Sequence, residues 1–197
     1  MTFRLKGHEH ALLSELTSFF ASQEFVNALA DKFEVDAAVT STDGGIQKYL
    51  DGYEISPHPD VRRKAMTYMV NINPSEESAQ LDIHTHYMKF KDKRRYVQEY
   101  WTHNIEAERC WVPWDWCETT KLQTANNSIV IFSPGNETIH AVKASYDHLA
   151  TQRTQIYGNL WYNENPCKTK PSWTDLDIRC KPKASRLTRI KQALSGT

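Results

Sequence analysis

Three absences narrow the functional classes open to this chain. Among its 197 residues, no apolar run approaches the ~20 residues that a membrane-spanning helix needs. Net charge is absent as well, since 24 Lys and Arg balance 24 Asp and Glu, which argues against a protein whose main task is to bind nucleic acid or anionic lipid. The first ten residues lack the apolar block of a secretory signal. We therefore expect a cytoplasmic protein with neither a nucleic acid nor a membrane as partner; the oligomeric state stays open.

Cysteine is also scarce. The cysteines form neither a CxxC pair nor the dense spacing of a disulfide framework; they are Cys110, Cys117, Cys167 and Cys180. We expect free thiols in a reducing compartment. A chain of this length with 40% hydrophobic residues can bury a core without cross-links. No linker or repeat divides it, so a single domain over residues 1–197 is expected.

The apolar pattern changes once along the chain. Apolar residues at helical spacing predict two amphipathic helices within residues 8–34, the second capped by Ser22. From 46 to 162 the pattern is typical of short strands separated by turns. The expected strands are 46–50, 64–73, 81–90, 96–101, 128–133, 138–144 and 153–162. Because they follow the helices rather than alternate with them, we predict an α+β protein: an all-β, jelly-roll core (a double-stranded β-helix) buttressed by the N-terminal helices.

Two segments depart from this pattern. Residues 101–123 carry four tryptophans without a clear period, which predicts a long aromatic loop, either beside the functional site or over a small core of its own. Residues 163–197 form a basic extension, with eight Lys and Arg against three acidic residues. Within it, 185–194 predicts a short helix, which we expect to be a solvated helix packed on the domain rather than a partner-binding arm.

The sharpest local motif is His58-Pro59-Asp60. In an extended segment, residues i and i+2 project to the same side, so this imidazole and carboxylate can point at one metal ion. Eighty residues later, after the Pro134-Gly135 turn, His140 begins an apolar strand and can complete a set of two histidines and one carboxylate. Such a set binds one face of a ferrous ion and leaves three positions open. Taken singly, His58 and Asp60 also fit a surface pair, and His140 a core histidine.

Arg153 lies thirteen residues after His140, and its planar guanidinium suits a bidentate pair with a dicarboxylate. Over 46–162 the chain resembles the Fe(II)- and 2-oxoglutarate-dependent dioxygenases, specifically the prolyl-4-hydroxylase-like branch. The resembling pieces are Tyr49, Gly52, His58-Pro-Asp60, the strand 63–71, Ile129–Pro134, His140-Ala-Val, Arg153 and Leu160-Trp-Tyr162.

The resemblance implies roles for six residues. The implied iron ligands are His58, Asp60 and His140. The implied partners of the distal carboxylate of 2-oxoglutarate are Arg153, by a salt bridge, and Tyr49, by a hydrogen bond. Gln155 stands where the family often has Ser, and its amide can still donate a hydrogen bond to the co-substrate.

The implied reaction is hydroxylation of an unactivated C–H bond of a peptidyl proline, an amino acid or a small metabolite. It consumes O2 and converts 2-oxoglutarate to succinate and CO2. The nucleic-acid-demethylating branches place a second arginine six residues after the first, where this chain has Asn159. The basic run 62–64 after the first ligands either holds an anionic substrate or forms a solvated edge.

Two other interpretations remain. The pair His84-Thr-His86, followed by His140, resembles the metal pattern of cupins that do not use 2-oxoglutarate, and predicts those three histidines as ligands. That set lacks the glutamate expected shortly after the pair and gives Arg153 no task; one of the pair could instead contact substrate. The third interpretation is a binding module with a relic site, which the presence of all three ligand types disfavours.

Overall fold

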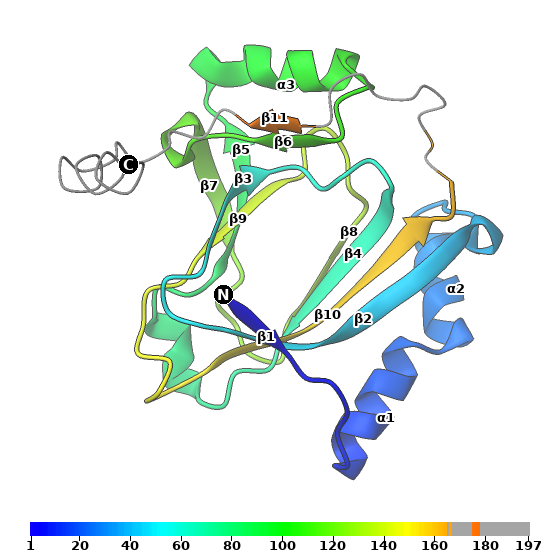
Figure 1. Cartoon of the computed structure of the whole chain (residues 1–197), viewed down its shortest axis with the longest axis vertical. Coiled ribbons are helices and arrows are strands. Elements are labelled where there is room, and N and C mark those ends of the chain that lie inside the picture. The colour runs from blue at the N-terminus through cyan, green and yellow to red at the C-terminus, as the bar shows by residue number, and fades with distance from the viewer. Residues whose placement is uncertain (165, 167–174, 178–197) are drawn as a thin grey trace, which may run out of the picture.

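The computed structural model describes residues 1–164, 166 and 175–177. Two antiparallel sheets face each other and form the core (Figure 1). The larger has the order β1 (Thr2–Arg4), β2 (Thr40–Tyr49), β10 (Arg153–Tyr162), β4 (Lys64–Asn71), β8 (Ile129–Phe132). The smaller has the order β3 (Glu54–His58), β9 (Ile139–Lys143), β5 (Thr85–Phe90), β7 (Cys117–Leu122). A further pair, β6 (Arg109–Trp111) and β11 (Asp175–Asp177), is parallel.

The strand order is that of a jelly roll. From β2 to β5 successive strands alternate between the larger and the smaller sheet, and from β7 to β10 they alternate again. Strands far apart in sequence therefore become neighbours, such as β3 beside β9 and β2 beside β10. Since each sheet turns one face toward the other, the fold creates an enclosed space between them. The predicted fold class is confirmed.

The longest pairing joins the start of the core to its end. β2 and β10 pair over ten residues, from Arg153 opposite Tyr49 to Tyr162 opposite Thr40. β10 has the bounds expected from the sequence, whereas β2 begins six residues earlier than expected. The difference arises because the pairing extends through Gly44 and Gly45, which carry no strand signal of their own.

Two helices cover the outer face of the larger sheet, as predicted. They are α1 (Ala11–Phe20) and α2 (Gln23–Lys32) (Figure 1). Ser22 caps α2 by accepting the Phe25 N–H at 3.2 Å. Val26 and Leu29 of α2 are buried against the sheet, and the Phe20 ring stacks on Tyr68 with centroids 5.2 Å apart.

The segment 96–101 was expected to be a strand and is instead part of α3 (Arg95–His103). Its aromatic and β-branched residues favour a strand by type. However, Val97 and Trp101 are four residues apart, and both are buried on one helix face against the outer side of the smaller sheet. Tertiary burial therefore overrides residue preference here.

The long aromatic loop predicted for 101–123 is also wrong. The segment holds the end of α3, the strands β6 and β7, and a short 3-10 helix at Trp114–Trp116. Trp101, Trp114 and Trp116 belong to or pack against the cluster between α3 and the smaller sheet. The remaining short 3-10 helices are Ala37–Val39, Glu76–Gln80 and Asp92–Arg94.

Several expectations concern the ends of the chain and its thiols. Cys110 and Cys117 are free and buried, as expected, whereas Cys167 and Cys180 lie outside the described residues. The helix predicted for 185–194 also lies outside them. Among the residues that the structure describes, no helix is both long and apolar enough to cross a membrane.

Candidate metal centre

The strand exchange brings together the two histidines and the carboxylate that the sequence singles out. His58 ends β3 and lies directly opposite His140 of β9, and Asp60 follows two residues later. The ring centroids of the two histidines are 4.4 Å apart. Ligand atoms of all three residues lie within 4.8 Å of one another. In the described part of the chain, they are the single group of three or more His, Cys, Asp or Glu so arranged.

Backbone carbonyls hold both imidazoles in the same tautomer. The Nδ1 of His58 is 2.8 Å from the carbonyl oxygen of Ser56, and the Nδ1 of His140 is 3.2 Å from that of Thr138. A carbonyl only accepts, so each Nδ1 carries the proton and each Nε2 keeps a free lone pair. A metal-binding histidine needs this tautomer, held by an outer partner on the other nitrogen.

The surroundings keep both imidazoles neutral and the carboxyl group charged. Burial, together with the neighbouring His140, lowers the pKa of His58 to about 3. Burial also lowers the pKa of His140. Burial raises the pKa of Asp60, but His140 and Lys64 outweigh it, so that this pKa lies below its ordinary value. Neutral imidazoles and a carboxylate are the protonation states that bind a divalent cation.

The carboxylate of Asp60 is held at both oxygens. Thr67 donates its hydroxyl proton to Oδ2 at 2.9 Å, and the Lys64 ammonium lies 2.8 Å from Oδ1. Oδ1 also lies 3.9 Å from Nε2 of His140. Oδ1 is therefore the oxygen that faces His140, and it already has a cationic partner.

Arg153 is buried between Thr85 and the ring of Tyr49, with one donor unused. Its side chain is 2% exposed, and its Nη2 donates to Thr85 Oγ1 at 2.9 Å. Its guanidinium carbon lies 3.8 Å from the ring centroid of Tyr49. Nη1 is buried and, among the described residues, has no hydrogen-bond partner. An unpartnered buried guanidinium nitrogen is costly, and a bound carboxylate would satisfy it.

Tyr49 and Gln155 form one hydrogen-bonded unit. The Tyr49 hydroxyl donates to Gln155 Oε1 at 2.8 Å and accepts from Gln47, and Gln155 Nε2 donates to Asn71 Oδ1 at 2.7 Å. Tyr49 lines the cavity described below, whereas the fully buried Gln155 lies behind it. The arrangement thus favours Gln155 as a support for Tyr49. A hydrogen bond from Tyr49 to a co-substrate requires its proton to turn away from Gln155.

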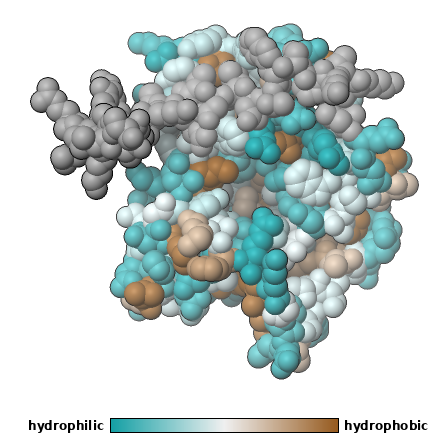
Figure 2. Space-filling view, viewed as in Figure 1, coloured by the Kyte–Doolittle hydropathy of each residue, from teal (hydrophilic) through white to brown (hydrophobic). Residues whose placement is uncertain are grey.

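A cavity of about 500 Å³ opens between the two sheets at this group. Figure 2 shows a recess near the middle of the face that carries the N-terminal strand. The metal-binding candidates lie on the cavity wall together with the aromatic residues Tyr49, Tyr53, Trp111, Tyr157 and Trp161 and the basic residues Arg4, Lys64 and Arg109. Of the four tryptophans in 101–123, Trp111 alone lines it. Both interpretations of that segment hold in part, because the other three pack over a core of their own.

The cupin-type ligand set is contradicted by the strand register. His86 lies opposite Ala141, whereas His140 lies opposite Tyr87, so the side chains of His86 and His140 point to opposite faces of the smaller sheet. His86 Nδ1 bonds Thr119 Oγ1 at 2.9 Å, and His84 Nε2 bonds a backbone carbonyl at 3.1 Å. Neither of them belongs to the group that meets at His140.

The three basic residues at 62–64 make different contacts. Arg62 donates to backbone carbonyls at the end of α3, and its guanidinium lies 3.9 Å from the Trp101 ring centroid. Arg63 is exposed and donates to the Tyr162 carbonyl at 3.3 Å. Of the three, Lys64 alone lines the cavity. Sequence reasoning missed the contact of Lys64 with Asp60, and it missed Thr67 and Thr85 altogether, because none of these contacts belongs to a motif.

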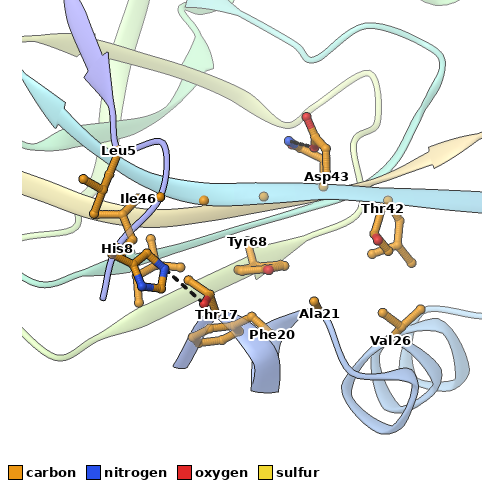
Figure 3. Close-up of a pocket in the computed structure, with 16 residues that line it drawn as sticks. Leu5, His8, Thr17, Phe20, Ala21, Val26, Thr42, Asp43, Ile46 and Tyr68 are labelled. Atoms are coloured by element: carbon orange, nitrogen blue, oxygen red, sulfur yellow. Dashed lines mark hydrogen bonds between the residues drawn. The ribbon is translucent and has the colours of Figure 1, made fainter. Parts of the chain in front are cut away.

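A second cavity, of about 380 Å³, lies on the other side of the larger sheet (Figure 3). It is lined by α1 and α2, the segment around Leu5 and His8, and the outer face of β2 and β10. His8 lies within 3.4 Å of the hydroxyls of Ser14 and Thr17. The cavity is separated by the sheet from the candidate metal centre and reflects incomplete packing of α1, which has no buried residue.

Comparisons with known proteins give matches to solved structures at low sequence identity. No protein-family model and no curated protein matches the sequence. A 2OG-Fe(II) oxygenase family oxidoreductase from Burkholderia pseudomallei matches at 9% identity and a TM-score of 0.42, over 77% of this chain. This chain spans 56% of that protein. EvdO2 from Micromonospora carbonacea var. aurantiaca, complexed with 2-oxoglutarate, matches at 10% identity and a TM-score of 0.46. That match covers 82% of this chain and 70% of EvdO2. A cupin superfamily protein from Desulfitobacterium hafniense matches at 8% identity and a TM-score of 0.27, over 62% of this chain and 77% of that protein.

Proposed function

We propose that this chain is a non-haem iron oxygenase that uses 2-oxoglutarate and O2 to hydroxylate an unactivated C–H bond. The observation that supports it most directly is the convergence of His58, Asp60 and His140, with both Nε2 lone pairs free. Two neutral nitrogens and one carboxylate oxygen are the donor set of facial ferrous sites. The unpartnered Nη1 of Arg153 adds a second, independent support, because it fits one end of a dicarboxylate.

Each residue has a defined task in this proposal. His58 and His140 present Nε2 to the metal, and Thr67 holds the Asp60 carboxylate in place from its far oxygen. Arg153, fixed by Thr85 and by the Tyr49 ring, binds the distal carboxylate of 2-oxoglutarate. A ferrous ion bound there would supply the oxidative decarboxylation of 2-oxoglutarate to succinate and CO2 and the coupled substrate hydroxylation. Burial of Asp60, His140 and Arg153 restricts water at the reacting centre.

The proposal also covers the class of substrate. A cavity of about 500 Å³ with aromatic walls suits a small metabolite, an amino acid or a peptidyl proline. Assignment to the prolyl-4-hydroxylase-like branch rests on the sequence resemblance. Asn159 lies on the cavity wall and donates to Asp43 at 2.7 Å, so it is committed to a structural contact. We retain the expectation that nucleic acid is not the substrate.

Anaerobic titration with Fe(II) and 2-oxoglutarate tests the proposal. We expect a weak visible charge-transfer band on addition of both, and succinate formation on admission of air. Asp60→Ala should lose the band and the succinate, and Arg153→Met should require much more 2-oxoglutarate. His86→Ala, which changes a histidine on the opposite face of the sheet, serves as the control. A band that persists in Asp60→Ala would overturn the assignment.

A further inference from the structure

Lys64 is placed where a metal-binding carboxylate would not ordinarily have a cation. It begins β4, and its ammonium lies 2.8 Å from Oδ1 of Asp60, the oxygen that faces His140. The two side chains are 16% and 7% exposed. Both a bound metal and Lys64 would therefore draw on the same carboxylate oxygen.

Within the described residues, Lys64 forms an ion pair with Asp60, and the second carboxylate on the same cavity wall, that of Asp43, accepts instead from Asn159 and Trp161. Among the ion pairs of the described residues, Asp60 is the only acidic partner of Lys64. The ammonium otherwise lies 5.4 Å from the Trp161 ring centroid. When the metal withdraws charge from Asp60, Lys64 is left as a partly buried cation with an aromatic face beside it.

The sum of the formal charges indicates how Lys64 affects metal binding. With both histidines neutral, the charges of Asp60 and Lys64 cancel, so the empty group is close to neutral. A divalent cation brings the sum to +2, on a cavity wall that also carries Arg4, Arg109 and Asp43. Like charges at short range in low dielectric repel strongly. A dianion bound next to the metal offsets the two charges that the metal brings to Asp60 and Lys64.

We propose that Lys64 makes metal binding conditional on the anionic co-substrate. It acts as a positioning residue through Asp60, weakening the metal site when it is empty of co-substrate and losing that effect once the dianion is bound. This inference rests on the proposed function, because it needs a metal and a dianion in one site. By linkage, the metal and 2-oxoglutarate then raise each other's affinity by the same factor.

Isothermal titration with Mn²⁺, with and without 2-oxoglutarate, tests this without any turnover. We expect Lys64→Met to bind Mn²⁺ alone about tenfold more tightly than the unmodified protein, within the usual range of coupling between sites. The enhancement by 2-oxoglutarate should shrink by the same factor. Lys64→Gln, which keeps a donor for Asp60 without the charge, should behave like Lys64→Met. It also keeps the test available if Lys64→Met does not fold.

The matched control is Lys48→Met. Lys48 lies on β2, and its ammonium donates to the His148 carbonyl, away from the metal-binding candidates. This variant should bind Mn²⁺ as tightly as the unmodified protein does, both with and without 2-oxoglutarate. An unchanged ratio of the two affinities in both Lys64 variants would overturn the inference while leaving the metal site intact. Weaker Mn²⁺ binding in both conditions would also overturn it, because Lys64 would then only support Asp60. Failure of every protein to bind Mn²⁺ would instead reject the proposed function.

Discussion

His58 and His140 face each other across the β3–β9 pairing, and each donates its Nδ1 proton to the carbonyl two residues before it. Each strand thus orients its own imidazole with its own backbone. The pairing then brings the two rings close enough for their Nε2 atoms to serve one metal ion. Such a pair is organised for a metal before the metal arrives.

Replacing either histidine should abolish tight metal binding. We expect His58→Ala and His140→Ala to lower Mn²⁺ affinity by roughly a hundredfold or more, since loss of an outer-shell partner alone costs about 10- to 100-fold. Titration calorimetry measures this directly. His86→Ala is the matched control, because His86 lies one register position from His140 and on the opposite face. Equal losses in all three variants would point to unfolding rather than ligation, which circular dichroism would show.

Arg153→Met should separate co-substrate binding from metal binding. A charge-assisted pair with a carboxylate contributes about 2 kcal/mol or more, so 2-oxoglutarate affinity should fall roughly thirtyfold. Affinity for Mn²⁺ should not fall, because Arg153 bonds Thr85 rather than any of the three metal candidates. Competition of 2-oxoglutarate with a fluorescent analogue on the Mn²⁺-loaded protein gives the measurement. Arg63→Met removes an exposed arginine and should leave both affinities unchanged; retained 2-oxoglutarate affinity in Arg153→Met would contradict the assignment.

The sequence was sufficient where local chemistry decides the structure. The run of strand-favouring residues over 153–162 predicted the bounds of β10, and Ser22 predicted the start of α2. The i, i+2 spacing of His58 and Asp60 correctly indicated that both could point at one spot. In each case the deciding interaction lies within a few residues of the pattern itself.

Other features depend on register between distant strands. Tyr49 and Gln155 are 106 residues apart, and they meet only because β2 and β10 pair in one alignment. The same is true of the opposite facing of His86 and His140. The helix α3 was missed because the burial of Val97 and Trp101 against a sheet outweighs their residue types. No pattern within a short window contains that information.

Arg62 should prove structural although it stands next to the candidate site. Its guanidinium satisfies the carbonyls of Trp101, Asn104 and Ala107 at 2.6, 3.1 and 2.9 Å, around the end of α3. We expect Arg62→Ala to lower the free energy of unfolding by about 2–3 kcal/mol, as hydrogen bonds from a charged donor are lost. Arg63→Ala, which removes one long bond from an exposed side chain, should change it by less than about 0.5 kcal/mol. Urea denaturation compares the two, and equal effects would contradict this role.

Gly158 should be intolerant of even one added methyl group. It lies on β10 between Gly44 of β2 and Tyr68 of β4, and a Cβ there would overlap the Tyr68 ring. That ring cannot move freely, because it packs against Phe20 and a second phenylalanine in the cluster under α1 and α2.

We therefore expect Gly158→Ala to destabilise the protein by about 3 kcal/mol, at the upper end of typical overpacking costs. Gly135→Ala should stay within about 0.5 kcal/mol, because nothing lies within 4 Å of its Cβ position. Urea denaturation with unchanged m-values measures both. If the overlap is the cause, adding Tyr68→Ala to Gly158→Ala should cost less than the sum of the single changes, because the ring that obstructs the methyl group is gone. Strict additivity would mean that Gly158 is needed for its backbone freedom rather than for the space that Tyr68 occupies.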